Sequence, residues 1–443
     1  MSRGRVLIVS YYFPPAGGSG VHRVLKLCKY LPEFGWDVEV LAPDDPKWIA
    51  HDPSLEQDVP DGVVVHRARY VGPDLALSDA DRIAAADGWH EVTARAAIAG
   101  RRLLLPDAAA PWIPFAVRTG VLAVRERRID VVLTSSPPTS SHVVGNLISR
   151  RTGVPWVADF RDSWLANPHR RYERRSVRYK RSLLGGIARQ TMGLAAAVTA
   201  VTDVIREEAE GYTGNPVPSQ TISNGCDFDD FAAYEHRGAA KLRLLHAGYF
   251  FGARSPRPLL QAVRSLLDRR PALRNVLEVR FVGGFRTADR EWAQSLDLGP
   301  VMSVEGTLPH DQTLRAMKEA DALVLLIPSA SGIGKTVLSG KVFEYLAAER
   351  PILGLVPPDG AAADLLRSAG HDWIADPDDV DAITATVERL VDAWIGNRLP
   401  DVVIPPELRA RLDRRARAEE MAAVLSDVTG RTAVGPMAMG AAR

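Results

Sequence analysis

Short runs of apolar residues alternate with helix-length segments along almost the whole chain. In the first half we expect strands at residues 6–9, 38–41, 63–66, 131–134, 154–159 and 197–201. The second half repeats the pattern at residues 242–247, 277–282, 301–304, 323–327, 352–356 and 373–375. Strand-length runs that alternate with helices are typical of parallel sheets with helices on both faces. The pattern therefore predicts an α/β fold.

A stretch rich in Gly and Pro at residues 211–219 interrupts this alternation. We therefore expect two doubly wound Rossmann-like domains, residues 1–222 and 223–404, that face each other across a cleft. Ligands of such folds bind beyond the carboxyl ends of the strands. The charged helix pattern at residues 405–426 either crosses back onto the first domain or caps the second.

The composition excludes several classes of protein. The chain is 46% hydrophobic and 25% charged, with a net charge of +1, which is typical of a soluble globular protein and gives no sign of a nucleic-acid partner. Two cysteines, Cys28 and Cys226, exclude a disulfide framework and a cysteine zinc site. No apolar run approaches the ~18 residues that cross a bilayer, and no signal-peptide cleavage site follows the first strand. We expect a cytoplasmic protein without a metal or a cofactor.

The most informative segment is residues 339–348, which follow an apolar strand and a glycine-rich loop. This order places a helix N-terminus at the carboxyl edge of a sheet, where backbone N–H groups and the helix dipole attract phosphate. Lys341 adds a positive charge, and Glu344, one turn later, can accept hydrogen bonds from sugar hydroxyls. The segment suits a nucleotide diphosphate that carries a sugar, although such a pattern is also found in solvated surface turns. The donor candidates here are Gly332, Gly334, Lys335, Ser339, Gly340, Lys341 and Glu344.

A phosphate-binding P-loop is the competing interpretation, because Gly334-Lys335-Thr336 resembles the end of that motif. The motif also needs a glycine at position 329, where this chain has Ser329. It should follow the first strand of its domain, whereas this segment lies far downstream. The sequence therefore does not favour a P-loop.

Two further loops leave strand ends with glycines. Gly17, Gly18, Ser19 and Gly20 follow the first strand and allow a ligand's oxygens to approach the backbone, as phosphate or sugar binding requires. In the second domain, Gly248 precedes Arg254 and Arg257, either of which can share a cleft with Lys341. Cations around a diphosphate stabilise the leaving group as the glycosidic bond breaks. We therefore expect Arg254 and Lys341 to act in catalysis.

Polar residues also follow two strands of the first domain. Asp159, Arg161, Asp162 and Trp164 form a cluster just past a buried strand. Such a cluster can bind acceptor hydroxyls or a developing positive charge, or it can be an Asp–Arg ion pair that holds two loops together. Upstream, Ser136 and His142 leave another strand end, where the hydroxyl groups can instead cap the next helix. We take Asp159, Arg161 and Asp162 as catalytic candidates, and Ser136, His142, Asp159, Arg161 and Trp164 as acceptor candidates.

Residues 170–181 carry seven Arg or Lys residues against one acid, Glu173. Such a run either engages an anionic lipid surface or an acidic acceptor, or it is a solvated face. It makes these residues a candidate site of peripheral membrane contact.

Taken together, these residues resemble a bacterial family 4 glycosyltransferase of the two-domain GT-B type. The matching pieces follow the family's order over about residues 5 to 400, and this order is more specific than any single motif. They are Pro14-Pro15 with Gly17-Gly18-Ser19-Gly20, Leu105-Pro106-Asp107 with Trp112, Ser136-Pro137-Pro138, Asp159-Phe160-Arg161-Asp162-Ser163-Trp164, Asn224-Gly225-Cys226-Asp227, Arg254-Ser255-Pro256, Val282-Gly283-Gly284 and Gly340-Lys341-Val342-Phe343-Glu344-Tyr345-Leu346.

The resemblance implies a retaining, metal-independent transferase. Its donor, a UDP-, GDP- or ADP-sugar, would lie mainly on the second domain, and its acceptor, a small molecule or a lipid-linked compound from polysaccharide or natural-product biosynthesis, mainly on the first. By this resemblance Glu344 would hold the donor ribose, Arg254 and Lys341 would contact the diphosphate, and the loop of residues 17–20 would lie against the phosphate and sugar. Attack from the front face would need no enzymatic nucleophile.

The chain departs from the family pattern at two positions. The first of the family's two frequent glutamates would fall at Thr336, so contacts to the sugar hydroxyls must come from other groups. Many relatives have a histidine where this chain has Arg161. Two rival functions stay open: a nucleotide-sugar epimerase or hydrolase on the same scaffold, and a non-catalytic GT-B subunit that binds a partner.

Overall fold

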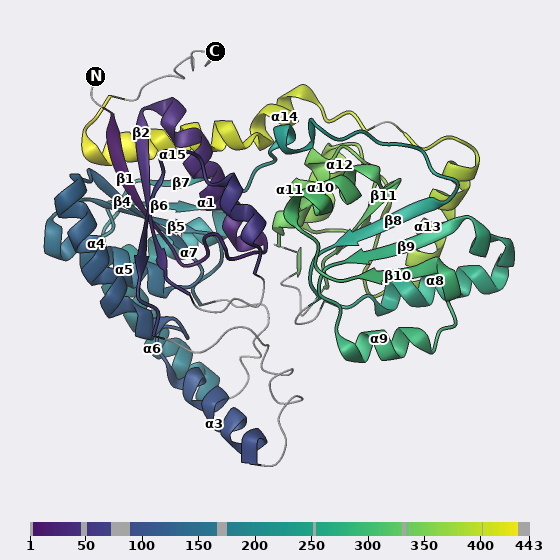
Figure 1. Ribbon diagram of the computed structural model, residues 1–443, viewed down its shortest axis with the longest axis horizontal. Coiled ribbons are helices and arrows are strands. Elements are labelled where there is room, and N and C mark those ends of the chain that lie inside the picture. Colours follow the sequence, from purple (N-terminus) through teal and green to yellow (C-terminus); the bar gives the residue numbers. More distant parts are fainter. Residues whose placement is uncertain are drawn as a thin grey trace. The chain divides into compact units, whose positions relative to one another are not determined.

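The computed structural model describes residues 3–45, 51–71, 89–165, 175–250, 254–329, 334–335, 337–400 and 402–432, without the side chains of residues 19, 102 and 175–177. The chain divides into two compact units (Figure 1). Unit 1 is Met1–Asn224 with Arg415–Arg443, and unit 2 is Gly225–Arg414. The sequence placed the passage between domains at residues 222–223.

Unit 1 contains a seven-stranded parallel sheet in the order β3-β2-β1-β4-β5-β6-β7. All of its pairings are parallel, so every strand delivers its carboxyl end to one edge. The strands are β1 (Gly4–Ser10), β2 (Trp36–Pro43), β3 (Val64–Ala68), β4 (Val131–Ser136), β5 (Trp156–Phe160), β6 (Ala197–Ala200) and β7 (Ser219–Thr221). The helices are α1 (Ser19–Tyr30), α3 (Trp89–Leu103), α4 (Ile113–Arg127), α5 (Ser140–Thr152), α6 (Arg175–Met192), α7 (Asp203–Thr213) and α15 (Arg414–Thr429).

Unit 2 contains a six-stranded parallel sheet in the order β10-β9-β8-β11-β12-β13. Its strands are β8 (Leu242–Ala247), β9 (Leu277–Val282), β10 (Met302–Glu305), β11 (Ala322–Leu326), β12 (Ile352–Leu355) and β13 (Ile374–Ala375). Its helices are α8 (Arg257–Arg269), α9 (Thr287–Gln294), α10 (His310–Glu319), α11 (Gly340–Ala347), α12 (Ala361–Ser368), α13 (Val380–Ile395) and α14 (Pro406–Leu412). Both strand orders reverse beside the first strand of the unit, as in doubly wound folds. The predicted α/β class is confirmed.

Short 3-10 helices connect several of these elements. They are η1 (Leu31–Phe34), η2 (Pro53–Asp58), η3 (Ala110–Trp112), η4 (Phe228–Phe231), η5 (Pro271–Asn275) and η6 (Gly299–Val301).

The strands form where the sequence has apolar runs because both faces of each sheet are covered. Val6, Leu7, Ile8 and Val9 of β1 are all completely buried. A continuous apolar run without alternation is what a strand buried on both faces requires. Two helices that cover the sheets begin with a side-chain cap: Thr202 accepts a hydrogen bond from Ile205 N before α7, and Asp379 accepts one from Ala382 N before α13.

Two local predictions differ from the structure. The end of the Gly- and Pro-rich break forms β7, whose side chains (Ser219, Gln220 and Thr221) give no apolar signal. The helix expected at residues 405–426 is two helices, α14 and α15, separated at Asp413, whose backbone is extended with φ −62° and ψ 129°. Of the two, α15 falls almost entirely within unit 1.

The two ends of unit 2 are bonded to each other. Cys226 N donates to Leu412 O at 2.6 Å, and Arg414 N donates to Cys226 O at 3.0 Å. Cys226 and Asp413 thus form a parallel bridge where the chain enters and leaves the unit. Gly225 is required beside it, because a Cβ there would lie 2.6 Å from Leu412 O.

Candidate functional site

The N-terminus of α11 lies where the sequence places the donor site. Val342, Phe343, Tyr345 and Leu346 of α11 are buried and anchor the helix in unit 2. Ser339 precedes the helix but makes no side-chain cap, and its buried Oγ has no hydrogen-bond partner among the described residues. The first N–H groups of α11 are therefore not capped by a side chain, which is the arrangement that binds anions at helix N-termini.

Lys341 reaches from α11 to the carboxyl end of β8. Its Nζ donates a hydrogen bond to Ala247 O at 2.6 Å. The next residue, Gly248, has φ +135°, and a Cβ on it would lie 1.5 Å from Lys341 Nζ. Only glycine leaves room for the ammonium group there. The structure therefore brings the predicted donor residues Lys341 and Gly248 together.

Tyr345 holds the same strand end from one turn further along α11. Its hydroxyl oxygen accepts a hydrogen bond from Ala247 N at 2.9 Å and donates to Ala247 O at 3.3 Å. Both backbone groups of Ala247 are thus tied to α11. The sequence analysis did not assign Tyr345 a role, although its spacing of four residues from Lys341 places both on one helix face.

The charges at this site are crowded and poorly solvated. Burial lowers the pKa of Lys341 to about 8, Glu344 opposes this shift, and Arg254 adds to it. Burial also lowers the pKa of Arg254, against the influence of Tyr345. Arg254, Lys341 and Glu344 are therefore close enough to interact, with two cations and one carboxylate. An incoming diphosphate would neutralise the excess positive charge.

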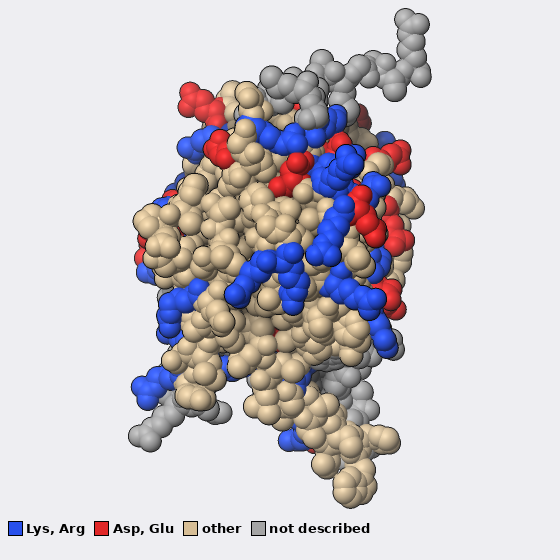
Figure 2. Space-filling model, turned by 90° about the vertical axis from the view of Figure 1, so that its left-hand side faces the viewer, with Lys and Arg blue, Asp and Glu red and all other residues tan. Residues whose placement is uncertain are grey.

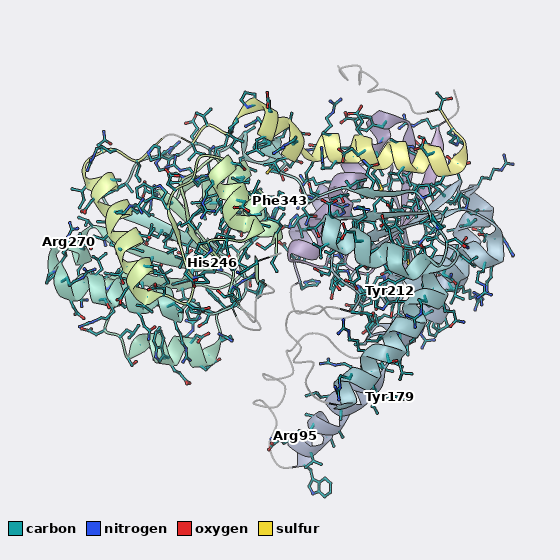
Figure 3. The ribbon with its side chains drawn as sticks, turned by 180° about the vertical axis from the view of Figure 1, so that it is seen from behind. Arg95, Tyr179, Tyr212, His246, Arg270 and Phe343 are labelled. Atoms are coloured by element: carbon teal, nitrogen blue, oxygen red, sulfur yellow. The ribbon has the colours of Figure 1, made fainter. Side chains whose placement is uncertain are left out.

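His246 supports this site from within the β8 strand (Figure 3). Its Nδ1 lies 2.9 Å from Val324 O and must donate to it, because a carbonyl only accepts, so the neutral ring keeps its lone pair on Nε2. That buried Nε2 has no hydrogen-bond partner in the structure. Burial, with Lys341 and Arg254 nearby, lowers the pKa of His246 to about 3. His246 is not among the residues that the sequence predicted for the site.

Three other candidates of unit 2, Gly334, Lys335 and Arg257, have contacts of their own. Lys335 is exposed and forms an ion pair with Asp359. At Gly334 a Cβ would lie 2.1 Å from Pro328 O, so the glycine serves a tight turn. Arg257, the alternative to Arg254, is bound to Asp289 at 2.7 Å. Gly332 lies outside the described residues.

In unit 1, Asp159 is fully engaged by other residues. Arg23 donates to both carboxylate oxygens, from Nε at 2.9 Å and from Nη2 at 2.7 Å. Ser135 and Thr199 each donate to the same carboxylate at 2.9 Å. Burial raises the pKa of Asp159, but Arg23 and these hydrogen bonds outweigh it and lower the pKa. This is the Asp–Arg ion pair that the sequence analysis kept as an alternative, with Arg23 of α1 as the partner.

Arg161 acts as a clamp on backbone carbonyls. Its Nε donates to Ser136 O at 3.0 Å, its Nη2 to Pro137 O at 2.9 Å, and its Nη1 to Gly20 O. The guanidinium group therefore joins the loop after β4 to the start of α1. Burial lowers the pKa of Arg161, while Asp162 and Asp159 oppose this shift.

The remaining acceptor candidates differ in exposure. Asp162 is exposed, whereas Ser136, His142 and Trp164 are buried. The His142 ring packs against Phe160 with ring centroids 4.3 Å apart and the planes tilted by 39°. Its Nδ1 is hydrogen-bonded to Thr134 Oγ1 at 2.7 Å, and burial lowers its pKa to about 3. A contact between His142 and an acceptor stays a prediction, and in this structure the side chain has no exposed surface.

The hydroxyl groups before α5 serve the helix. Thr139 Oγ1 and Ser140 Oγ both donate to Asp107 at 2.7 Å, and Ser140 N donates to it at 2.8 Å. Asp107 thus accepts from the N-terminus of α5, whereas the hydroxyl groups, which were the expected caps, donate to Asp107 instead. Asp107 belongs to Leu105-Pro106-Asp107, one of the segments on which the family resemblance rests.

The glycine loop of unit 1 ends at the start of α1. Gly18 has φ +83° and immediately precedes the helix, and no side chain caps it. Gly17 is half-buried, and Gly20 is held through its carbonyl by Arg161. The backbone of Ser19 begins α1, while its side chain lies outside the described set. The structure therefore defines the backbone of this loop, and its contact with a donor stays a prediction.

Only part of the basic run at residues 170–181 is described. Residues 170–174 and the side chain of residue 175 lie outside the described set. Arg178 and Arg181 of α6 are exposed, and Lys180 is half-buried. Within the described ranges, no helix combines the length and apolarity that crossing a membrane requires. Within the same ranges, no three His, Cys, Asp or Glu side chains come together as metal ligands would.

Comparison with known proteins identifies a domain family for part of the chain and solved structures that share its fold. Residues 17–225 match the glycosyl transferase 4-like domain family. No curated protein sequence matches the chain significantly. Among solved structures, sucrose-phosphate synthase from Thermosynechococcus elongatus has a TM-score of 0.62 at 15% identity. The match covers 97% of this chain and 100% of the synthase chain.

Two more structures share this fold. HepE (Alr3699) of Anabaena, in complex with UDP-glucose, has a TM-score of 0.63 at 14% identity, covering 96% of this chain and 99% of its own. A protein described as UDP-N-acetylglucosamine 2-epimerase from Listeria monocytogenes has a TM-score of 0.51 at 13% identity. The match covers 98% of this chain and 99% of the Listeria chain. Identities this low establish the fold alone. The domain match agrees with the predicted resemblance over residues 17–225, and the shared fold confirms the predicted GT-B architecture of two parallel sheets with alternating helices.

Proposed function

We propose that this chain, which carries a glycosyltransferase-family domain on a GT-B fold, transfers a sugar from a nucleotide diphosphate sugar to an acceptor hydroxyl or amine. We propose further that the anomeric configuration is retained and that neither a metal nor another cofactor is needed. The binding of UDP-glucose by HepE, a protein of the same fold, supports a nucleotide-sugar donor.

The observation that carries the proposal is the cationic site at the start of α11. Burial lowers the pKa of Lys341, and the positive charge of Arg254 lowers it further. Burial also lowers the pKa of Arg254. Burial deprives both cations of water, Glu344 offsets part of the charge on Lys341, and a bound anion would offset more of it. Gly248 has no side chain, which leaves room for the Lys341 ammonium at the end of β8. A diphosphate fits this position because both of its phosphates carry negative charge.

The chemistry follows from this placement. The bond between the anomeric carbon and the β-phosphate oxygen breaks, and its electron pair stays on the phosphate. The acceptor oxygen or nitrogen forms the new bond on the same face, and its proton passes to the departing phosphate oxygen. Lys341 and Arg254 stabilise the charge that accumulates on the leaving nucleoside diphosphate. Glu344 would accept hydrogen bonds from the donor ribose.

Unit 1 would bind the acceptor, although its buried polar groups serve mainly to shape the site. The four hydrogen bonds to Asp159 leave it no capacity to act as a general base. We therefore assign Asp159 and Arg161 to positioning the loops after β4 and β5. The exposed Asp162 is the group of this cluster that an acceptor can reach.

The test is a donor panel of UDP-, GDP- and ADP-sugars with a set of candidate acceptors, read by release of free nucleoside diphosphate. The Lys341→Ala variant should lower kcat by about 10²- to 10³-fold, because the variant loses a charge that acts on the leaving group. Exposed Lys335 offers the matched control, and Lys335→Ala should retain most of the activity. Equal activity in wild type and Lys341→Ala would refute the assigned site.

The same assay separates the rival functions. An epimerase or hydrolase would convert the nucleotide sugar without any acceptor, and the shared fold with the Listeria protein makes this the relevant control. A non-catalytic subunit would give no nucleoside diphosphate with any donor and no thermal shift with UDP, GDP or ADP. Acceptor-dependent release of the diphosphate would support the transferase.

A further inference from the structure

Helix α3 presents an apolar stripe to solvent. Of its described side chains, only Ile98 is buried. Trp89 is 82% exposed, Val92 56% and Leu103 80%. At about 100° per residue, positions 89, 92, 96, 99 and 103 fall within an arc of about 80°. These residues, Trp89, Val92, Ala96, Ala99 and Leu103, are named the α3 stripe.

The α3 stripe faces away from the body of unit 1. Ile98, the buried residue of α3, lies on the opposite side of the helical wheel from positions 89 to 103. Helices α3 and α6 both project from the same end of unit 1, where Arg95 and Tyr179 mark them (Figure 3). In Figure 2 the lowest projection, which corresponds to α3, is drawn mostly as residues other than Lys, Arg, Asp and Glu. An exposed tryptophan at such a tip is unusual for a surface that only meets water.

Helix α6 adds a second apolar and basic surface to this end of unit 1. Tyr179 is 69% exposed and Leu183 40%, and Arg178, Arg181 and Arg189 are exposed on the same helix. Together α3 and α6 contain eight Arg or Lys residues and one acid, Glu91. That acid is already bound to Arg95 at 2.8 Å. The two helices therefore combine exposed apolar side chains with an excess of basic residues.

We propose that the α3 stripe docks onto an anionic lipid bilayer, with the basic residues of α6 against the headgroups. Trp and Leu on one helix face with Lys and Arg around them are the composition of helices that lie in the membrane interface. A second copy of this chain fits less well, because both copies would bring the same positive charge to the contact. A lipid surface with anionic headgroups satisfies both the apolar stripe and the charge.

This inference does not depend on the transferase activity. It moves the expected membrane contact from the basic run alone to a helix that the sequence analysis left without a role. A peripheral contact of this kind holds unit 1 at the bilayer without any spanning segment. Lipid-linked acceptors would then be the acceptor class within reach of unit 1.

The full-length protein should be tested by co-sedimentation with vesicles of phosphatidylcholine, with and without phosphatidylglycerol. Wild type should bind the vesicles that contain phosphatidylglycerol, and binding should weaken as salt increases. The Trp89→Ser/Leu103→Ser variant should lose affinity by at least about tenfold, because the apolar contact is removed. Arg178→Ser/Arg181→Ser should weaken binding and reduce its salt dependence.

The matched control is Leu122→Ser/Val204→Ser, which removes two exposed apolar side chains of unit 1 from α4 and α7. It should bind as wild type does. All variants change exposed residues, so their thermal unfolding should match wild type and exclude misfolding as the cause. Absence of vesicle binding by wild type, or full binding by Trp89→Ser/Leu103→Ser, would overturn the proposal. So would a dimer in light scattering that this variant abolishes, since the stripe would then bind a second copy.

Discussion

Lys341 Nζ occupies the space that a side chain on Gly248 would fill, 1.5 Å from the ideal Cβ position. The strand end and the helix are therefore matched to each other: glycine at 248 is what allows the ammonium group to reach Ala247 O. This pairing of two residues 93 positions apart in sequence is the basis of the first prediction.

Gly248→Ala should displace the Lys341 ammonium and strain a backbone that has φ +135°. A displacement of about 1 Å in a catalytic group can cost about 10²-fold, so we expect kcat/KM to fall by that order. Steady-state kinetics with the donor identified by the panel would measure it. Gly211→Ala is the control, because a Cβ at Gly211 meets nothing within 4 Å. An unchanged kcat/KM in Gly248→Ala would show that the position of Lys341 does not matter.

The affinity for the donor should decrease above pH 8. Burial lowers the pKa of Lys341 to about 8, so the ammonium group is charged at pH 7 and loses its charge as the pH rises. The value of kcat/KM should then fall by up to tenfold per pH unit above 8. Neither His142 nor His246 contributes a titration near neutrality, because burial lowers both pKa values to about 3.

The control for this profile is Lys341→Ala, whose residual activity should lack the alkaline decrease. The stability of the folded protein should change with pH in the opposite direction to the activity. Because the pKa in the folded protein lies below its usual 10.5, the penalty on the buried charge is present below pH 8 and is relieved between pH 8 and 10.5. A profile that is flat to pH 9.5 in wild type would contradict the assigned role of Lys341.

Glu344→Ala should raise the KM for the donor by about tenfold and change kcat less, because the proposed ribose contact is made before and during the reaction. Calorimetry with the nucleoside diphosphate alone would measure the same loss of affinity. Glu349→Ala is the matched change two residues beyond the helix, where the carboxylate pairs with Arg409. Equal loss in both variants would indicate a general effect of charge.

Arg23→Met should destabilise unit 1 by about 3–5 kcal/mol, because Asp159 would remain charged and buried without its partner. The side chain of Arg23 is 7% exposed, and that of Asp159 is completely buried. Denaturant unfolding would measure the loss. The exposed pair Arg3–Asp37, at 2.6 Å, provides the comparison, and Asp37→Asn should cost about 1 kcal/mol or less.

Asp159→Asn distinguishes positioning from catalysis at this cluster. If Asp159 only positions Arg23, Ser135 of β4 and Thr199 of β6, the variant should lose stability. Its kcat should then return towards the wild-type value when a stabilising osmolyte restores folding. A folded Asp159→Asn protein whose kcat is lowered by 10³-fold or more would show that the carboxylate takes part in the chemistry.

The sequence predicted the elements better than the contacts between them. Twelve strands could be predicted because most of them are apolar runs that are buried in a sheet. The thirteenth, β7, is polar and three residues long, so neither length nor hydrophobicity marks it. The division of the C-terminal pattern into α14 and α15 was also not predictable from periodicity, since charged helix formers continue through Asp413.

The candidate site shows the same limit. Lys341 and Gly248 each follow a strand, and parallel strands deliver such residues to one edge, so their proximity could be predicted. The partner of Asp159 could not be: the nearest arginine in sequence, Arg161, turns to backbone carbonyls, while Arg23, 136 residues away, forms the ion pair. Pairing of buried charges depends on side-chain direction in the folded protein, which no local pattern records.

The bridge between Cys226 and Asp413 has a consequence for how such proteins can be rearranged. Residues 225–414 begin and end beside the bridge between Cys226 and Asp413, so both ends of this block of sequence lie at one place. Exchanging it for the corresponding block of another protein requires only that these two junctions be matched. Under the proposed function, in which unit 2 binds the donor, recombination can thus supply a new donor specificity while the rest of the chain keeps its own sequence.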